Sequence, residues 1–283
     1  MNIYLIIGII VGITLFFGAI IYFFQNKVIF HPEKLPQDFQ FAYENLNAEE
    51  KIVETEPGAK ISYLHFRVEN PKGLVFYMKG NTKSIKGWGK FAIDFTRLDY
   101  DVLMMDYRGF GKSTGRRSVE ALKHDTQFIY DIAKKEYSEE NIVVYGRSLG
   151  TGFAARLASK NSPKMLILTS PLYSFVRAIH QYLPGMPAKP FLRYNIPTFQ
   201  YLKYVRCPIK IIHGSDDKLV PVKTAVDLSE INPKLTRLYI IVGAHHIDVH
   251  QFEDYHRVME EIFDQKKTEP NFETTSLRIN HRK

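Results

Sequence analysis

The distribution of hydrophobic and polar residues divides the chain into an apolar beginning, an alternating middle and a polar end. Positions 3 to 24 carry no formal charge and are rich in Ile, Leu, Val and Phe. At the rise of an α-helix, such a run spans roughly the ~30 Å hydrocarbon core of a bilayer. We therefore expect an N-terminal transmembrane helix and assign residues 1–26 to a single-pass membrane anchor.

A cleaved signal peptide is the alternative for this segment. The segment lacks a basic start, its apolar part exceeds the usual ~7–15 residues, and no A-x-A-like cleavage site follows. An uncleaved anchor is therefore favoured. Lys27 and Lys34 follow the helix, which favours a cytoplasmic domain, but the charge bias rests on these two lysines and leaves the opposite orientation open.

The middle of the chain alternates short apolar or β-branched runs with longer segments of helical spacing, a pattern typical of a mostly parallel sheet with helices on both faces. We predict strands at Lys51–Glu56, Ile61–Val68, Leu74–Met78, Val102–Asp106, Ile142–Tyr145, Met165–Thr169, Ile209–His213 and Leu238–Val242. We predict helices at Val119–Glu136, Gly150–Ser159, Thr224–Glu230 and Phe252–Phe263. A chain of 283 residues with 45% hydrophobic content can bury one large core, so residues 27–264 are expected to form a single α/β domain.

Two segments depart from the alternation. Residues 171–205 contain five prolines and many aromatic residues, which indicates an insertion of short pieces rather than one crossover helix. We expect this insertion to be a small helical lid over a site, with plain packing against the domain as the alternative. Residues 265–283 are polar and charged, and we expect them to be a flexible tail.

Composition excludes some classes of function. Cys207 is the single cysteine, so no intrachain disulfide can form, and its place before an apolar run favours a small buried residue over a catalytic thiol. The net charge of +8 is spread along the chain without a motif that reads bases, so nucleic-acid binding is not expected. Near an anchor, basic residues favour anionic lipid head groups.

The first candidate for chemistry is Ser148, in the sequence Gly-Arg-Ser-Leu-Gly at positions 146–150. This G-x-S-x-G pattern follows a predicted strand and opens a predicted helix, which is the context of a nucleophile elbow. The turn strains the serine backbone, and the two glycines let strand and helix approach closely. Ser148 is therefore predicted to be a nucleophile.

A nucleophilic serine needs a histidine base that is oriented by a carboxylate. Downstream, one strand ends in Asp216 and Asp217, and the next ends in His245 and His246, in the chain order that this elbow requires. Asp217 is preferred as the acid, although either aspartate is able to cap the following helix. The spacing leaves the choice between the two histidines open.

A metal site is the alternative for the cluster of His245, His246, Asp248 and His250, because imidazoles and a carboxylate at short spacing can bind zinc. A second group of ligands is lacking in the sequence, whereas the serine elbow requires a histidine here. We expect neither a metal nor a cofactor.

The oxyanion of a tetrahedral intermediate needs two backbone N–H donors. One is expected from the residue after the nucleophile, Leu149, and the other from the loop after the strand Leu74–Met78. Asn81 is the candidate in that loop, and Gly80 would let the backbone approach a substrate carbonyl.

At this point the chain resembles the α/β-hydrolases of the serine aminopeptidase and lysophospholipase-like type, particularly a membrane-anchored branch, from about Gly73 to Phe263. Besides the elbow, the stretch Asp106–Ser113 is similar to the branch's D-Y-R-G-[YF]-G-x-S signature. The resemblance implies an α/β-hydrolase fold.

The resemblance also assigns the remaining members of the triad. The family pattern H-G-x-x-D-x-x-[VL] falls on His213, Gly214, Asp217 and Leu219 or Val220, which implies Asp217 as the acid. The pattern G-x-G-H falls on positions 243–246, which implies His246 as the base, with His245 in place of the usual glycine. Lys79 replaces the histidine of an H-G-N loop, which raises the hypothesis of an entrance that favours anionic substrates.

Two classes of function follow. The first is a serine hydrolase that cleaves a carboxylic ester or thioester through an acyl-enzyme on Ser148, with a small-molecule or lipid-like acyl substrate favoured by the anchor and the apolar insertion. A serine peptidase of the same fold is a variant of this class. The second is a non-catalytic, membrane-tethered binding protein that keeps the fold. Such a protein is expected to lack a triad residue, and none is missing here.

Overall fold

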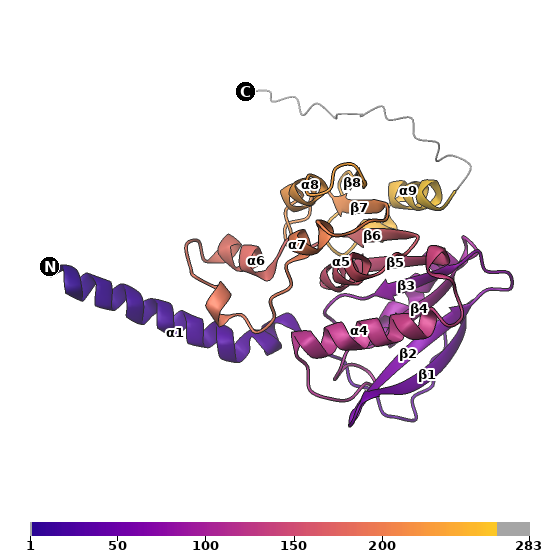
Figure 1. Cartoon of the computed structure of the whole chain (residues 1–283), viewed down its shortest axis with the longest axis horizontal. Helices are drawn as coiled ribbons and strands as arrows, with labels where there is room; N and C mark the ends of the chain where they lie inside the picture. The colour runs from indigo at the N-terminus through magenta and orange to yellow at the C-terminus, as the bar shows by residue number, and fades with distance from the viewer. Residues whose placement is uncertain (1, 265–283) are drawn as a thin grey trace.

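The computed structural model of the chain describes residues 2–264 (Figure 1). In this part of the chain, eight strands form one sheet with the order β1-β2-β4-β3-β5-β6-β7-β8. The strands are β1 (Asn47–Glu56), β2 (Ala59–Arg67), β3 (Leu74–Met78), β4 (Asp101–Met105), β5 (Ile142–Arg147), β6 (Met165–Thr169), β7 (Ile209–Gly214) and β8 (Thr236–Ile241).

The sheet is antiparallel at one edge and parallel elsewhere. β1 and β2 form a hairpin, β2 pairs antiparallel with β4, and the remaining neighbours pair parallel. This confirms the mostly parallel sheet that the alternation predicts. The predicted strands are all present. β3 and β6 have the predicted ends, whereas the others are shifted; β1, for example, begins at Asn47 rather than Lys51.

Every residue of β3, β4, β5 and β6 is buried, as expected for parallel strands covered on both faces. Because side chains alternate along a strand, the core divides into two layers. In β5, Ile142 and Val144 belong to one layer, and Val143 and Tyr145 belong to the other.

Helices cover both layers, which confirms the α/β architecture (Figure 1). α4 (Val119–Ala133), α5 (Gly150–Lys160) and α8 (Lys223–Ser229) bury apolar residues in the first layer. The helices that bury apolar residues in the second layer are α2 (Ile85–Trp88), α3 (Ile93–Thr96) and α9 (Glu253–Phe263). Short 3-10 helices lie at Gly89–Ala92, Glu139–Asn141, Lys189–Phe191 and Val249–Gln251.

The first helix, α1 (Ile3–Ile29), projects away from the domain at its N-terminal end, while its C-terminal end joins the domain (Figure 1). It is long and apolar enough to cross a membrane, and almost none of its most apolar stretch is buried by the rest of the chain. The helix continues beyond residue 26, the predicted end of the anchor, because its last turns pack against the domain rather than projecting from it.

The predicted insertion at residues 171–205 contains α6 (Phe175–Tyr182) and α7 (Thr198–Leu202). α7 lies against α5, and the rings of Tyr173 and Phe199 stack at 4.7 Å between centroids. The tail predicted at 265–283 lies outside the described residues.

Candidate active site

Ser148 lies at the sharp turn between β5 and α5, with a backbone φ of 51°. This left-handed conformation is uncommon for a residue with a side chain and directs the hydroxyl away from the strand. A Cβ on Gly146 would meet Ala154 and Thr151 at 2.7 Å, and a Cβ on Gly150 would overlap the carbonyl oxygen of Met78. The glycines on either side of Ser148 are therefore required by close packing, as the G-x-S-x-G pattern predicts.

The side chains of Ser148, His246 and Asp217 form one hydrogen-bonded chain. Nε2 of His246 lies 2.9 Å from Oγ of Ser148, and Nδ1 of His246 lies 2.7 Å from Oδ2 of Asp217. His246 comes from the loop after β8 and Asp217 from the loop after β7, so three strand ends at one edge of the sheet supply the group. This geometry allows the imidazole to take the serine proton while the carboxylate holds the ring.

Asp217 is held as a carboxylate by its surroundings. Burial of the side chain opposes ionisation, but hydrogen bonds from His213 and His246 overcome this effect and hold its pKa well below the usual range. The backbone N–H groups of Leu219 and Val220 also donate to Oδ1, at 3.0 and 2.8 Å. Asp217 therefore stays charged over the whole range in which the protein is expected to work.

The structure distinguishes Asp217 from Asp216 as the acid, and His246 from His245 as the base. Asp216 is exposed and accepts a hydrogen bond from the hydroxyl of Ser215, at 2.6 Å. His245 is also exposed, and its Nδ1 lies 3.2 Å from the carbonyl oxygen of Gly243. Neither of these residues contacts Ser148, so the structure brings together the residues that the family patterns select.

His213 and Arg147 were not predicted to have a part in the site. Nε2 of His213 lies 2.8 Å from the carbonyl oxygen of Val220 and 3.2 Å from Asp217, so this buried ring supports the acid loop. Its place in the H-G-x-x-D pattern was the signal that marked it. The buried guanidinium of Arg147 donates to the carbonyl oxygen of Ile247, at 2.7 Å, and so ties the elbow to the residue after His246.

The predicted oxyanion residues lie beside the serine. The position of a Cβ on Gly80 is 3.7 Å from Cβ of Ser148, so the loop after β3 passes directly next to the nucleophile. Leu149 is buried at the start of α5. The side-chain amide of Asn81 donates to the carbonyl oxygen of Ile29 at 2.7 Å. The backbone carbonyl oxygen of Asn81 accepts a hydrogen bond from the N–H of His31 at 2.9 Å. The end of α1 therefore holds this loop in place.

The hypothesis that Lys79 favours anionic substrates at the entrance is wrong. The Lys79 side chain is fully buried; its Nζ lies 3.4 Å from Oδ1 of Asp106 and 3.8 Å from the ring centre of Phe110. Burial lowers the pKa of Lys79 and raises that of Asp106, and their mutual attraction opposes both shifts. The hydroxyl of Tyr107 donates to the backbone carbonyl oxygen of Lys79 at 2.8 Å. The ion pair of Lys79 with Asp106 and this hydrogen bond together hold the start of the loop after β3.

The histidines after β8 point to different partners. His246 faces Ser148, His245 faces solvent, and His250 packs its ring edge-to-face against Phe91 with 4.7 Å between centroids. Among residues 2–264, no group of three or more His, Cys, Asp or Glu side chains is placed to hold a metal ion.

A strained serine after the fifth strand, an acid after the seventh and a histidine after the eighth form the arrangement that is typical of α/β-hydrolases. The chain has the α/β-hydrolase fold and is similar in sequence to proteins that carry the α/β-hydrolase name. Residues 69–205 match the family model described as serine aminopeptidase, S33. This match includes Ser148 but ends before Asp217 and His246.

Two relatives carry the α/β-hydrolase name. The alpha/beta hydrolase domain-containing protein aho-3 of Caenorhabditis elegans is 32% identical over 154 residues, which are 54% of this chain and 45% of that protein. This chain therefore matches less than half of the worm protein. The alpha/beta hydrolase domain-containing protein 17C of Xenopus tropicalis is 27% identical over 77% of this chain and 71% of its own length.

Solved structures show the same fold. The Pyrococcus furiosus esterase Pf2001 has a TM-score of 0.65 at 22% identity and covers 82% of this chain and 96% of its own. The ferulic acid complex of Est1E from Butyrivibrio proteoclasticus has a TM-score of 0.62 at 19% identity, over 75% of this chain and 97% of its own. Both comparisons confirm the α/β-hydrolase fold.

Proposed function

We propose that the protein is a serine hydrolase that cleaves a carboxylic ester or thioester through an acyl-enzyme on Ser148. The observation that carries this proposal is the hydrogen-bonded chain from Ser148 through His246 to Asp217. The esterase activity named for the Pyrococcus neighbour supports an ester substrate.

The proposed reaction uses each group in turn. Nε2 of His246 takes the proton of Ser148 as its oxygen attacks the substrate carbonyl, and Asp217 stabilises the imidazolium that forms. The backbone N–H groups of Leu149 and Asn81 bind the oxyanion. His246 then gives the proton to the leaving group, and a water molecule activated by the same imidazole releases the acyl group.

A lipid-like acyl chain is the substrate class that the surroundings favour. Next to the acid loop, α6 and the residues after Asp217 enclose a hollow of about 350 Å³, whose walls include Leu172, Tyr173, Leu219 and Val220. The walls also carry Arg177, His180 and Lys223, so their apolar part is where a hydrocarbon chain would be bound. With α1 as a membrane span, the site would meet acyl substrates at a membrane, on either side of it.

Labelling by a fluorophosphonate probe tests the proposal. Wild-type protein should be labelled, Ser148→Ala and His246→Ala should not, and His245→Ala, a matched change at the adjacent exposed histidine, should be labelled like the wild type. Folded wild-type protein that stays unlabelled would contradict the proposal and favour a non-catalytic binding protein. A series of esters of increasing acyl length then measures the preference for lipid-like chains.

A serine peptidase is the second candidate, because the matching family model is described as a serine aminopeptidase. Hydrolysis of aminoacyl anilides separates the two. Turnover of the anilides above that of the esters would favour the peptidase, and labelling alone does not distinguish them.

A further inference from the structure

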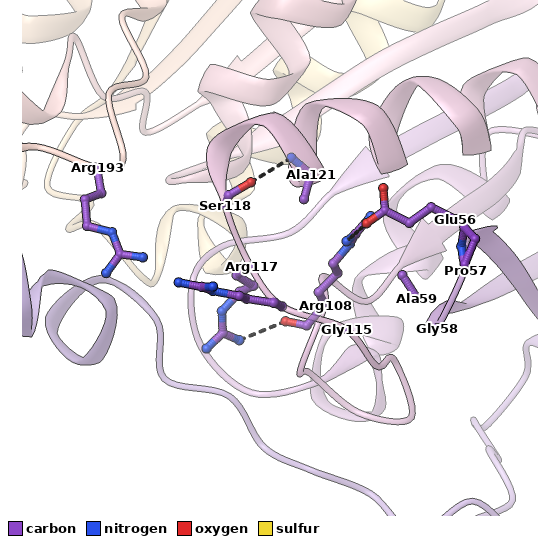
Figure 2. A pocket seen from close by; sticks show the side chains of 11 residues that line it. Glu56, Pro57, Gly58, Ala59, Arg108, Gly115, Arg117, Ser118, Ala121 and Arg193 are labelled. Carbon is purple, nitrogen blue, oxygen red and sulfur yellow. Dashed lines mark hydrogen bonds and ion pairs between the residues drawn. The ribbon is translucent and has the colours of Figure 1, made fainter.

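A second hollow, of about 500 Å³, lies away from Ser148 beside the loop that follows β4 (Figure 2). One wall is the turn of the β1–β2 hairpin at Glu56–Ala59, and another is the start of α4. The feature that distinguishes this hollow is its charge, because its walls carry the four arginines Arg108, Arg116, Arg117 and Arg193. Figure 2 shows three of these side chains, those of Arg108, Arg117 and Arg193, around it.

Arg108 has a structural part in this hollow. Its guanidinium donates to both carboxylate oxygens of Asp125, at 2.7 and 2.8 Å, and it also pairs with Glu56. Glu56 is the acidic residue in the walls of the hollow, and Arg108 engages it. The other three arginines are therefore left without a carboxylate partner from the walls.

Arg117 presents donors that the protein uses only in part. One nitrogen, Nη1, donates to the carbonyl oxygen of Arg108 at 2.9 Å, and the guanidinium lies over the rings of Phe30 and Phe110 at 4.9 and 5.1 Å. Its Nε is buried and has no hydrogen-bond partner in the described part of the chain. Leaving a charged donor unpaired is unfavourable unless a ligand or water completes it.

Arg116 and Arg193 are exposed, and within residues 2–264 their guanidinium groups make no hydrogen bond or ion pair. The start of α4 adds to the positive potential, since Ser118 caps a helix of 15 residues whose N-terminal end faces the hollow. Two guanidinium groups without a hydrogen bond or ion pair, a third that is only partly satisfied and a helix N-terminus favour a multiply charged anion with several acceptor oxygens, which describes a phosphate group better than a carboxylate.

We propose that this hollow binds a phosphate group through Arg116, Arg117 and Arg193. Its place suggests a source for that phosphate. The guanidinium of Arg193 lies 5.6 Å from the ring centre of Tyr22, and its backbone N–H donates to Gln25 at 2.8 Å, so the hollow lies at the end of α1 that joins the domain. A lipid head group would be presented there if α1 spans a membrane, as the proposed function requires; a soluble phosphate ester would reach the same arginines from the solvent.

Phosphate binding is tested on the full chain in neutral detergent, by the shift of the unfolding temperature in inorganic phosphate against chloride at equal ionic strength. We expect phosphate to stabilise the wild type, and the double variant R116Q/R193Q to bind it about tenfold more weakly for each guanidinium removed. The matched control is R237Q/R257Q, which removes two exposed arginines from β8 and α9 at the opposite edge of the sheet and should respond like the wild type.

Equal stabilisation by phosphate in wild type and R116Q/R193Q would overturn the proposal, as would equal effects of phosphate and chloride on the wild type. Both replaced side chains are exposed, so the unfolding temperature in chloride should not change and reports whether the variant folds. Serine labelling is not part of this test, and its failure would leave the phosphate result unaffected.

A second arm identifies the source of the phosphate. The wild type is placed in nanodiscs of phosphatidylcholine alone or with added phosphatidylglycerol, and inorganic phosphate is titrated into each. Loss of the phosphate effect in the phosphatidylglycerol discs, together with its retention in the phosphatidylcholine discs, would assign the site to an anionic lipid head group. The control variant R237Q/R257Q should behave like the wild type in both discs. A phosphate effect that is equal in both discs would assign it to a soluble phosphate.

Discussion

Replacing Gln25 by leucine should detach the insertion from α1. The Gln25 side chain is 4% exposed; its Nε2 donates to the carbonyl oxygen of Phe191 at 3.1 Å, and its Oε1 accepts from the N–H groups of Arg193 and Tyr194 at 2.8 and 3.2 Å. Leucine has a similar size but cannot form these bonds, so the change isolates the polar contribution of one side chain.

The expected magnitude follows from these three contacts. A hydrogen bond contributes about 0.5–1.5 kcal/mol net, and a buried group left without its partner costs about 1–3 kcal/mol. Arg193 is exposed, so water can replace its partner, whereas Tyr194 is buried. We therefore expect local opening of the insertion to become easier by about 2–3 kcal/mol, which corresponds to amide exchange roughly 30- to 150-fold faster.

Hydrogen exchange followed by mass spectrometry measures this effect directly. Peptides that contain Arg193 and Tyr194 should lose protection in Gln25→Leu, while peptides of the central strands should not change. Gln40→Leu is the control, because Gln40 is exposed and bonds locally to Asp38. Unchanged protection at Arg193 and Tyr194 in Gln25→Leu would refute the inference that α1 holds the insertion.

Three further changes test the site and its surroundings. Gly150→Ala places a Cβ against the carbonyl oxygen of Met78 and should destabilise the fold by about 1–3 kcal/mol; an unchanged unfolding temperature would contradict the packing argument. Arg147→Met removes a charged donor from the Ile247 carbonyl and should slow fluorophosphonate labelling by roughly tenfold, whereas a wild-type rate would show that the tie is dispensable. Burial and the charge of Arg147 lower the pKa of His250 from its ordinary 6.5 to about 4, so the unfolded state binds more protons than the folded state between these pH values. The free energy of unfolding should therefore fall as the pH drops from 6.5 toward 4. His250→Asn should flatten that decline in melting curves.

The parts of the fold that could be predicted from sequence are those that depend on local patterns. β5 and β6 are short runs that are buried on both faces, and their hydrophobic sequences marked them nearly to the residue. The elbow at Ser148 could be located because its glycines are required by contacts within the same strand–turn–helix unit. The short helices between Ile85 and Thr96 were missed, because a helix of four residues is too short to show a period.

Features that depend on distant contacts could not be predicted. Lys79 is next to Asp106 because β3 and β4 are neighbours in the sheet, and residues 79 and 106 come together only in the folded chain. Arg147 occupies the variable position of the elbow, so its sequence gave no sign that it would reach the loop after β8. The choice between His245 and His246 depended on a family pattern, since the loop sequence does not show which of the two adjacent side chains faces Ser148.

The contacts between Asn81 and the segment Ile29–His31 bear on how the protein can be shortened or cleaved. A recombinant fragment that begins at the first strand would be free of the apolar helix, but it would lack the carbonyl of Ile29 and the N–H of His31 that fix the loop beside the serine. Proteolysis between α1 and the domain would have the same effect in a cell. If α1 spans a membrane and Ser148 is the nucleophile, as proposed, shedding would inactivate the protein rather than release an active soluble form. Fragments for crystallisation should therefore begin before Gln25.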